Sequence, residues 1–336
     1  MLLPRHRSPL LQASLQFSLA LGCSASDASF QDGGAPLGNG PPVDAVTNLA
    51  PTNESPTNDA GAPSPAGPLP AATPGGATLA VRLRFVARVG AEPFACGSSY
   101  RSSSGEGFTP ADLRLFVQDV ALVDSAGNEH TVALDVRAPW QTDSVALIDF
   151  EDGSAACLAG TRERNVEVSG RVEPGDYRGI AFSNGVPEAL NHADPSRLPP
   201  PLQAGSMSWG WLQGYRFLMA EVAGTAVSGD AAVPGSALLH VGSTACSGNP
   251  SAGGIACSKP NRNRVRLPEF DPDADAIVVD LAELFGDMDL AAVTTCHSSG
   301  EDCAPLFERI GLDLTSGAPS DGQRIYRVEP ASATDP

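Results

Sequence analysis

From residue 80 onward, the sequence repeats one pattern: short runs in which apolar residues alternate with polar ones, each followed by Gly, Pro, Asp or Asn. The clearest run covers residues 80–89, where Val81, Leu83 and Phe85 are separated by single arginines. Such alternation places the apolar side chains on one face of a β-strand. Further runs occupy residues 113–123, 130–134, 145–150, 165–172, 177–182, 215–222, 237–242 and 325–328. Many short strands with turn residues between them predict an all-β domain, an antiparallel β-sandwich or barrel-like fold with long loops.

Helical patterns are few in this sequence. Asp280 and Glu283 have the spacing of a capping box, which predicts a short helix over residues 280–285. Residues 109–112 could start a further turn of helix. The Pro-rich loop over residues 186–207 is long for a compact domain, and such loops are usually functional or disordered. Because this loop leads directly into a Trp-rich segment, we favour a functional role.

The N-terminus is predicted to be a signal peptide over residues 1–22. Arg5 and Arg7 are its only charged residues, and the mostly apolar stretch that follows is too short to span a bilayer. Residues 19–23 resemble a lipobox, which predicts a lipid on Cys23. The alternative is plain cleavage and a free exported protein. In either case we expect the protein to be located in the periplasm, at the outer membrane or at the cell surface. Its contact with the membrane would be only through the lipid.

Residues 23–76 are rich in Pro, Ala, Gly and Ser and contain almost no large apolar side chain. Such a segment cannot bury enough surface to offset its loss of conformational entropy. We therefore predict a disordered tether over residues 23–76, a β domain over residues 77–328 and a disordered tail over residues 329–336. Formal net charge is −18, which disfavours nucleic acid as a partner.

Six cysteines follow Cys23, and an even number in an exported chain predicts three disulfides. These residues are Cys96, Cys157, Cys246, Cys257, Cys296 and Cys303. Short loops favour the pairs Cys246–Cys257 and Cys296–Cys303, which leaves Cys96–Cys157, although other connectivities are open. A thiolate metal site is the alternative, but no two of these cysteines have the Cys-x-x-Cys spacing that many such sites use.

Two acidic clusters offer rival chemistry. Asp149 and Glu151 flank Phe150 and could perform acid–base work in a hydrolase, although hydrogen bonding within a loop is the simpler interpretation. Asp271, Asp273 and Asp275 have the spacing of a calcium loop, but the Gly and Glu that an EF-hand needs further along are missing. A solvated acidic turn is favoured there.

Histidines and tryptophans supply the candidate metal site. His192 lies in the long loop, and His240 lies in the predicted strand over residues 237–242. Imidazole is a good ligand for copper and zinc. Met207, Trp209 and Trp211 follow the loop at spacing two. They could simply pack in the core, or they could bring a thioether and electron-rich rings close to a metal or redox centre.

These segments together resemble the MbnP-like family, copper-binding periplasmic proteins associated with methanobactin operons and also described as four-Cys proteins of a "metallo-mystery pair". The resemblance covers most of residues 80–328. It rests on the ordered succession of Phe94-Ala95-Cys96, residues 112–117, Trp140, residues 145–152, Cys157, Gly185-Val186-Pro187, Asn191-His192, Met207-x-Trp209-x-Trp211, Gly214-Tyr215, His240-x-Gly242-Ser243, Cys246 and Cys257-x-x-Pro260-Asn261-Arg262.

The resemblance implies a copper-binding protein that is not an enzyme and acts in copper acquisition, storage or delivery. It implies His192 and His240 as copper ligands and Met207 as a weak ligand or close neighbour. It also implies that a di-haem cytochrome c peroxidase-like (MbnH-like) partner oxidises Trp209 or Trp211 to kynurenine, with Trp209 preferred and Trp140 a further candidate.

This sequence differs from the family pattern at His297, which follows Cys296 where we expect Met. His297 could therefore be an additional ligand. Two other function classes stay open at this point. One is a tethered interaction or adhesion module without metal, and the other is a hydrolase that uses the acidic clusters.

Overall fold

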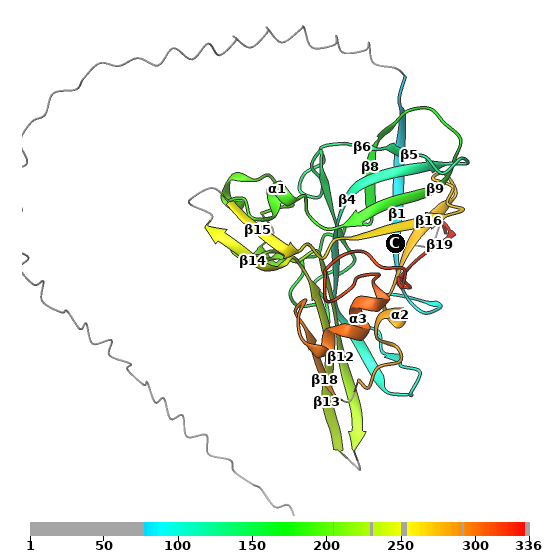
Figure 1. Cartoon of the computed structure of the whole chain (residues 1–336). Coiled ribbons are helices and arrows are strands. Elements are labelled where there is room, and N and C mark those ends of the chain that lie inside the picture. The colour runs from blue at the N-terminus through cyan, green and yellow to red at the C-terminus, as the bar shows by residue number, and fades with distance from the viewer. Residues whose placement is uncertain (1–76, 204, 229–230, 250–253, 291, 333–336) are drawn as a thin grey trace, which may run out of the picture. The chain divides into compact units, whose positions relative to one another are not determined.

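The computed structural model describes residues 77–203, 205–228, 231–249, 254–290 and 292–332 (Figure 1). The predicted signal peptide, Cys23 and the predicted tether lie outside the described residues, as do residues 333–336 of the predicted tail. Among the described residues, no helix combines the length and the apolar composition that crossing a membrane requires.

Strand β1 (Leu79–Val89) lies at the centre of the first sheet. Its buried face carries Leu83 and Phe85, each 1% exposed, as the alternating pattern predicts. The order in this six-stranded sheet is β19 (Tyr326–Pro330), β17 (Asp275–Asp280), β1, β8 (Glu167–Val172) and β6 (Ala133–Leu134), with β2 (Glu92–Pro93) paired to β1.

A nine-stranded sheet forms the second layer. Its main path is β16 (Asn263–Pro268), β9 (Tyr177–Asn184), β4 (Gly107–Asp124), β12 (Leu218–Ser228), β13 (Ala231–Val241) and β18 (Val293–Cys296). Strands β3 (Tyr100–Arg101), β5 (Glu129–Thr131) and β7 (Val145–Asp149) also pair with β4. The rings of Phe85 and Phe182 meet edge to face across the two sheets, with centroids 5.7 Å apart.

Two small hairpins complete the β structure: β10 (Ser208–Gly210) with β11 (Gly214–Tyr215), and β14 (Thr244–Asn249) with β15 (Gly254–Lys259). Strand pairs are antiparallel except β1–β17 and β13–β18, which are parallel. The prediction of an all-β fold is confirmed. The turn of helix suggested at residues 109–112 is wrong, because β4 runs straight through this segment and pairs with β12.

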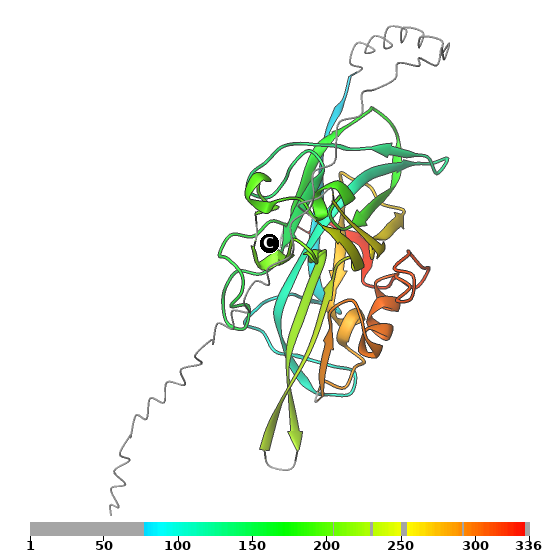
Figure 2. The ribbon, with the colours of Figure 1, turned by 60° about the vertical axis from the view of Figure 1, so that its left-hand side comes forward.

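The helices are short: α1 (Glu188–Asn191), α2 (Leu281–Phe285) and α3 (Ala304–Arg309). Helix α2 matches the predicted helix, and the Asp280 carboxylate accepts a hydrogen bond from the Ala282 amide at its first turn. Helices α2 and α3 pack together beside the hairpin of β12 and β13 (Figure 2).

The six cysteines form three disulfides, and the pairs are those that the short loops favour: Cys96–Cys157, Cys246–Cys257 and Cys296–Cys303. A second, smaller apolar cluster lies under the long loop and includes Met207, Tyr215 and Phe217. This cluster supports the segment that carries Trp209.

Candidate metal centre

His240 lies next to the end of β13, where the strand pairs with β12. Met219 is directly opposite His240, so the two side chains share a face of the sheet, and Glu221 lies on the same face two residues further along β12. The Oε1 atom of Glu221 accepts a hydrogen bond from Nε2 of His240 at 2.6 Å. A carboxylate can only accept, so Nε2 carries a hydrogen, and in the neutral ring Nδ1 keeps its lone pair. That Nδ1 atom is buried and has no hydrogen-bond partner.

The imidazole of His297 packs against that of His240, with ring centroids 4.9 Å apart. Strand β18 brings His297 here because it pairs in parallel with β13, with Cys296 opposite Leu239. Ser298 fixes the turn that follows: its hydroxyl donates to the carbonyl of His240 and accepts from the amide of Gly242. Two imidazoles from separate strands therefore meet at one point.

The indole of Trp209 completes this group of three rings. Its centroid lies 6.4 Å from that of His240 and 6.3 Å from that of His297. The ring passes so close to Gly242 that a Cβ atom there would lie 2.4 Å from Cζ3 of the indole. The guanidinium of Arg216 lies 5.5 Å from the indole centroid.

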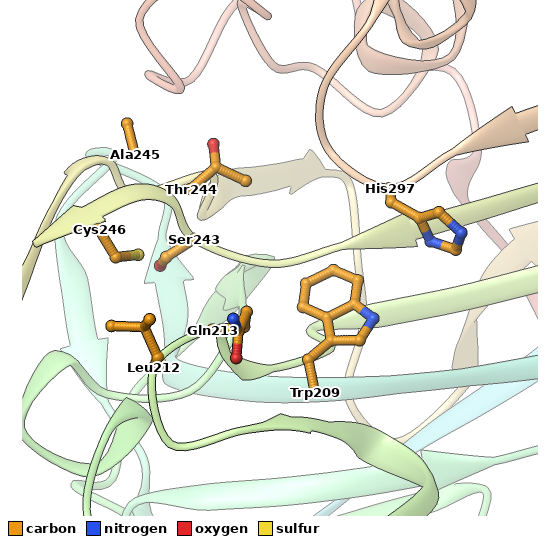
Figure 3. A pocket seen from close by; sticks show the side chains of 8 residues that line it. All are labelled: Trp209, Leu212, Gln213, Ser243, Thr244, Ala245, Cys246 and His297. Atoms are coloured by element: carbon orange, nitrogen blue, oxygen red, sulfur yellow. The ribbon is translucent and has the colours of Figure 1, made fainter. Parts of the chain in front are cut away.

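A cavity of about 530 Å³ opens beside these rings (Figure 3). Trp209 and His297 line one end of it, and Leu212, Ser243 and Cys246 line the other. The rings are therefore accessible from outside the core, although His240 itself is only 7% exposed.

The electrostatics favour the neutral, ligand-competent form of His297. Burial lowers the pKa of His297, and the nearby His240 and Arg216 lower it further. The hydrogen bond from His240 lowers the pKa of the Glu221 carboxyl, so this acceptor stays ionised. When both rings are neutral, His297 and the Nδ1 atom of His240 offer two nitrogen lone pairs, the donor set that copper accepts.

The other predicted site residues lie elsewhere. At the end of α1, the Nδ1–H of His192 donates to the carbonyl of Trp211 at 2.9 Å, and its Nε2 lies 3.1 Å from Sγ of Cys257. Within the described residues, no ring contact joins His192 to His240. Met207 is fully buried in the smaller apolar cluster, and Trp211 is 44% exposed.

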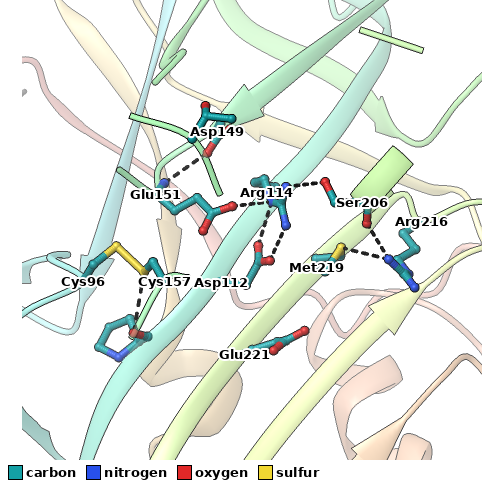
Figure 4. Close-up of polar contacts among 12 residues, drawn as sticks. Cys96, Asp112, Arg114, Asp149, Glu151, Cys157, Ser206, Arg216, Met219 and Glu221 are labelled. Carbon is teal, nitrogen blue, oxygen red and sulfur yellow. Dashed lines mark hydrogen bonds and ion pairs between the residues drawn. A yellow bond between two sulfur atoms is a disulfide. The ribbon is translucent and has the colours of Figure 1, made fainter. Parts of the chain in front are cut away.

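The acidic pair Asp149 and Glu151 surrounds a buried arginine (Figure 4). Arg114 bonds to Asp112 and forms an ion pair with Glu151 at 2.8 Å. Burial raises the pKa of Asp149 to about 7 and that of Glu151 to about 8. Glu151 has no exposed surface. Arg114 and Asp149 also line a second cavity of about 410 Å³, whereas Glu151 does not. The two carboxylates thus serve mainly to surround the buried guanidinium, as hydrogen bonding within the fold predicts.

Asp271 and Asp275 form a local turn, in which carboxylate oxygens accept from the amides of Asp273 and Asp271. These bonds fit the solvated acidic turn that the sequence favours.

Sequence reasoning missed Glu221, Met219 and Arg216. The run over residues 215–222 contains all three, but alternation alone does not show which strand lies beside it. The importance of His297 was visible only as a departure from the family pattern.

Two of three comparisons with known proteins gave a match. The family model MbnP matches residues 78–298. Among solved structures, MbnP from Methylosinus trichosporium is 32% identical in sequence and superimposes with a TM-score of 0.66. The match covers 76% of this chain and 100% of the other. The comparison with curated proteins gave no match.

Proposed function

Because the chain belongs to the MbnP family, which is linked to methanobactin and copper, we propose that it is a copper-binding protein of the bacterial cell envelope. Its task is copper acquisition, storage or delivery, and it catalyses no reaction of its own. A cleaved signal peptide and a lipid on Cys23 would hold it at the periplasmic or outer surface.

One observation carries the proposal: the buried, unpartnered Nδ1 of His240 in a ring pair with His297, with Nε2 fixed by Glu221. A buried polar atom without a partner is costly, so its presence needs an explanation. A metal ion between the two imidazoles would supply one. Copper prefers such nitrogen ligands, and a carboxylate on the far nitrogen is the usual support for a metal-bound histidine.

The resemblance implied His192 as the partner of His240, whereas the ring contacts favour His297. Both assignments can be tested on the same preparation. The purified chain is loaded with copper, dialysed and analysed for metal content as the wild type and as His240→Ala, His297→Ala and His192→Ala.

We expect one copper per chain, lost in His240→Ala and His297→Ala and retained in His192→Ala. His130→Ala is the matched control, because His130 bonds to Asp124 on a different part of the sheet. A wild-type chain that retains no copper under any loading condition would refute the proposal.

Of the two candidates for the tryptophan oxidation that the family implies, we favour Trp209 over Trp211. Trp209 packs against both imidazoles, whereas Trp211 is largely exposed and interacts with His192 through its carbonyl. Ring opening at Trp209 would place a carbonyl and an aromatic amine beside the copper.

Co-expression with a di-haem MbnH-like partner, followed by peptide mass analysis, tests this step. We expect the kynurenine mass change in wild type and in Trp211→Phe, and none in Trp209→Phe. Modification that persists in Trp209→Phe would move the site to another tryptophan.

A further inference from the structure

The disulfide Cys246–Cys257 differs from the other two in its surroundings. Cys96, Cys157, Cys296 and Cys303 are at most 3% exposed. Cys246 and Cys257 are half-buried, and Cys246 lines the same cavity as Trp209. A thiol reagent or partner can therefore reach this disulfide while the other two stay enclosed, since exchange requires access to a sulfur atom.

His192 points its unprotonated nitrogen at this disulfide. Its Nδ1 must carry the hydrogen, because the carbonyl of Trp211 can only accept. Nε2 is therefore the bare nitrogen, and it accepts from the side-chain amide of Asn191 while it lies 3.1 Å from Sγ of Cys257. The ligand atoms of His192, Cys246 and Cys257 all lie within 4.8 Å of one another.

The hairpin would keep the two sulfurs together after reduction. Cys246 and Cys257 are directly opposite in the β14–β15 ladder, with Cα atoms 3.8 Å apart, and further strand pairs flank them on both sides. Two thiolates on one metal ion lie about 3.8 Å apart, given metal–sulfur bonds of about 2.3 Å. Side-chain rotation can provide this separation without movement of the strands.

We propose that Cys246, Cys257 and His192 form a second metal site, closed by the disulfide and opened by reduction. It would take a closed-shell ion with high affinity for sulfur, Cu(I) or Zn(II). A dithiol transfers two electrons and two protons to the disulfide, which yields two cysteine thiols and the oxidised dithiol. The metal ion then displaces both thiol protons and takes the Nε2 lone pair of His192 in place of the Asn191 amide. This proposal stands on its own contacts and does not depend on copper at His240 and His297.

The test begins with mild reduction of the folded, purified chain by dithiothreitol, followed by alkylation and peptide mass analysis. We expect Cys246 and Cys257 to be alkylated well before the four enclosed cysteines. The chain is then titrated anaerobically in its oxidised and reduced forms, with Cu(I) against a colorimetric competitor and, in a separate arm, with Zn(II).

We expect one more metal ion per chain in the reduced form than in the oxidised form, in at least one arm. His192→Ala should weaken this additional binding at least tenfold, and His130→Ala should leave it unchanged. The double variant Cys246→Ser, Cys257→Ser should lose only the additional ion. Because His192→Ala keeps both cysteines, it decides the question even where the double variant folds poorly.

Equal metal content in the oxidised and reduced chains would overturn the proposal, as would additional binding that is unaffected by His192→Ala. Failure of the copper site is a separate result, because that site is measured in the oxidised chain and through His240→Ala.

Discussion

The carboxylate of Glu221 holds the imidazole of His240 at 2.6 Å across two neighbouring strands. In the neutral ring, this bond decides which nitrogen of His240 carries the hydrogen, and it leaves the buried Nδ1 atom without one. The same carboxylate keeps the ring orientation fixed, since β12 and β13 pair without interruption along this stretch.

We expect Glu221→Gln to weaken copper binding about 10–100-fold, the usual effect of losing the partner of a metal-bound histidine. The glutamine amide can donate its NH₂ group to Nε2 as well as accept from it. The side chain at residue 221 then no longer selects the tautomer that leaves Nδ1 without a hydrogen. Competition titration with a copper chelator measures the change. Glu173→Gln is the control, because Glu173 is exposed and lies on neither of the strands that carry Glu221 and His240. This variant should bind copper as the wild type does.

Gly242→Ala should displace the indole of Trp209. The added Cβ would lie 2.4 Å from Cζ3 of the indole and 2.5 Å from the carbonyl oxygen of Tyr215, so one of them must move. We expect a loss of about 1–3 kcal/mol in the free energy of unfolding, as is typical of overpacking. Near-UV circular dichroism and chemical denaturation test this. Gly205→Ala, where nothing lies within 4 Å of the added atom, should behave like wild type.

The metal-free protein should become less stable as the pH rises from about 4 to about 8. Burial raises the pKa of Asp149 to about 7 and that of Glu151 to about 8. In this window the folded state keeps protons that the unfolded chain has already released, so a rise in pH favours unfolding.

Melting temperatures at several pH values should show this slope, and Asp149→Asn should reduce it. Asp176→Asn, at an exposed ion pair with Arg178, should leave the slope unchanged. An equal slope in Asp149→Asn and wild type would contradict the assignment.

The enclosed disulfides should differ in what they contribute to stability. The Cys96–Cys157 bond closes a loop with a sequence separation of 61, whereas the Cys296–Cys303 bond has a separation of 7. On the loop-entropy account, replacing both cysteines by Ala should cost about 4 kcal/mol for the first pair and about 2 kcal/mol for the second. Urea denaturation of the two double variants measures the loss in the free energy of unfolding for each disulfide. A larger loss for Cys296–Cys303 than for Cys96–Cys157 would contradict this account.

Much of the local structure was predictable from sequence. Alternation of apolar residues located β1, β4 and β9, and the acid spacing at Asp280 located α2. Short loops gave two cysteine pairs and, by elimination, the third. These features depend on neighbours in the chain, and local sequence patterns report such neighbours directly.

The metal centre was only partly predictable. The sequence offered His192, His240 and the segment with Met207, Trp209 and Trp211 as candidates, and the family resemblance then assigned His192 and His240 as ligands and favoured Trp209. In the structure, His192 lies on the Cys246–Cys257 disulfide and His297 lies beside His240.

By itself, then, the sequence determined the all-β class, several of the strands and the cysteines that join them, because each depends on residue type and spacing. It did not predict β14 to β18, most of which show no clear alternation of apolar and polar residues. The placement of Glu221, His240 and His297 around one point was decided only by the tertiary structure. The hairpin of β12 and β13 meets there the residue that follows β18, which lies more than 50 residues further along the chain, and this register comes from packing of the whole core, which no single stretch of sequence encodes.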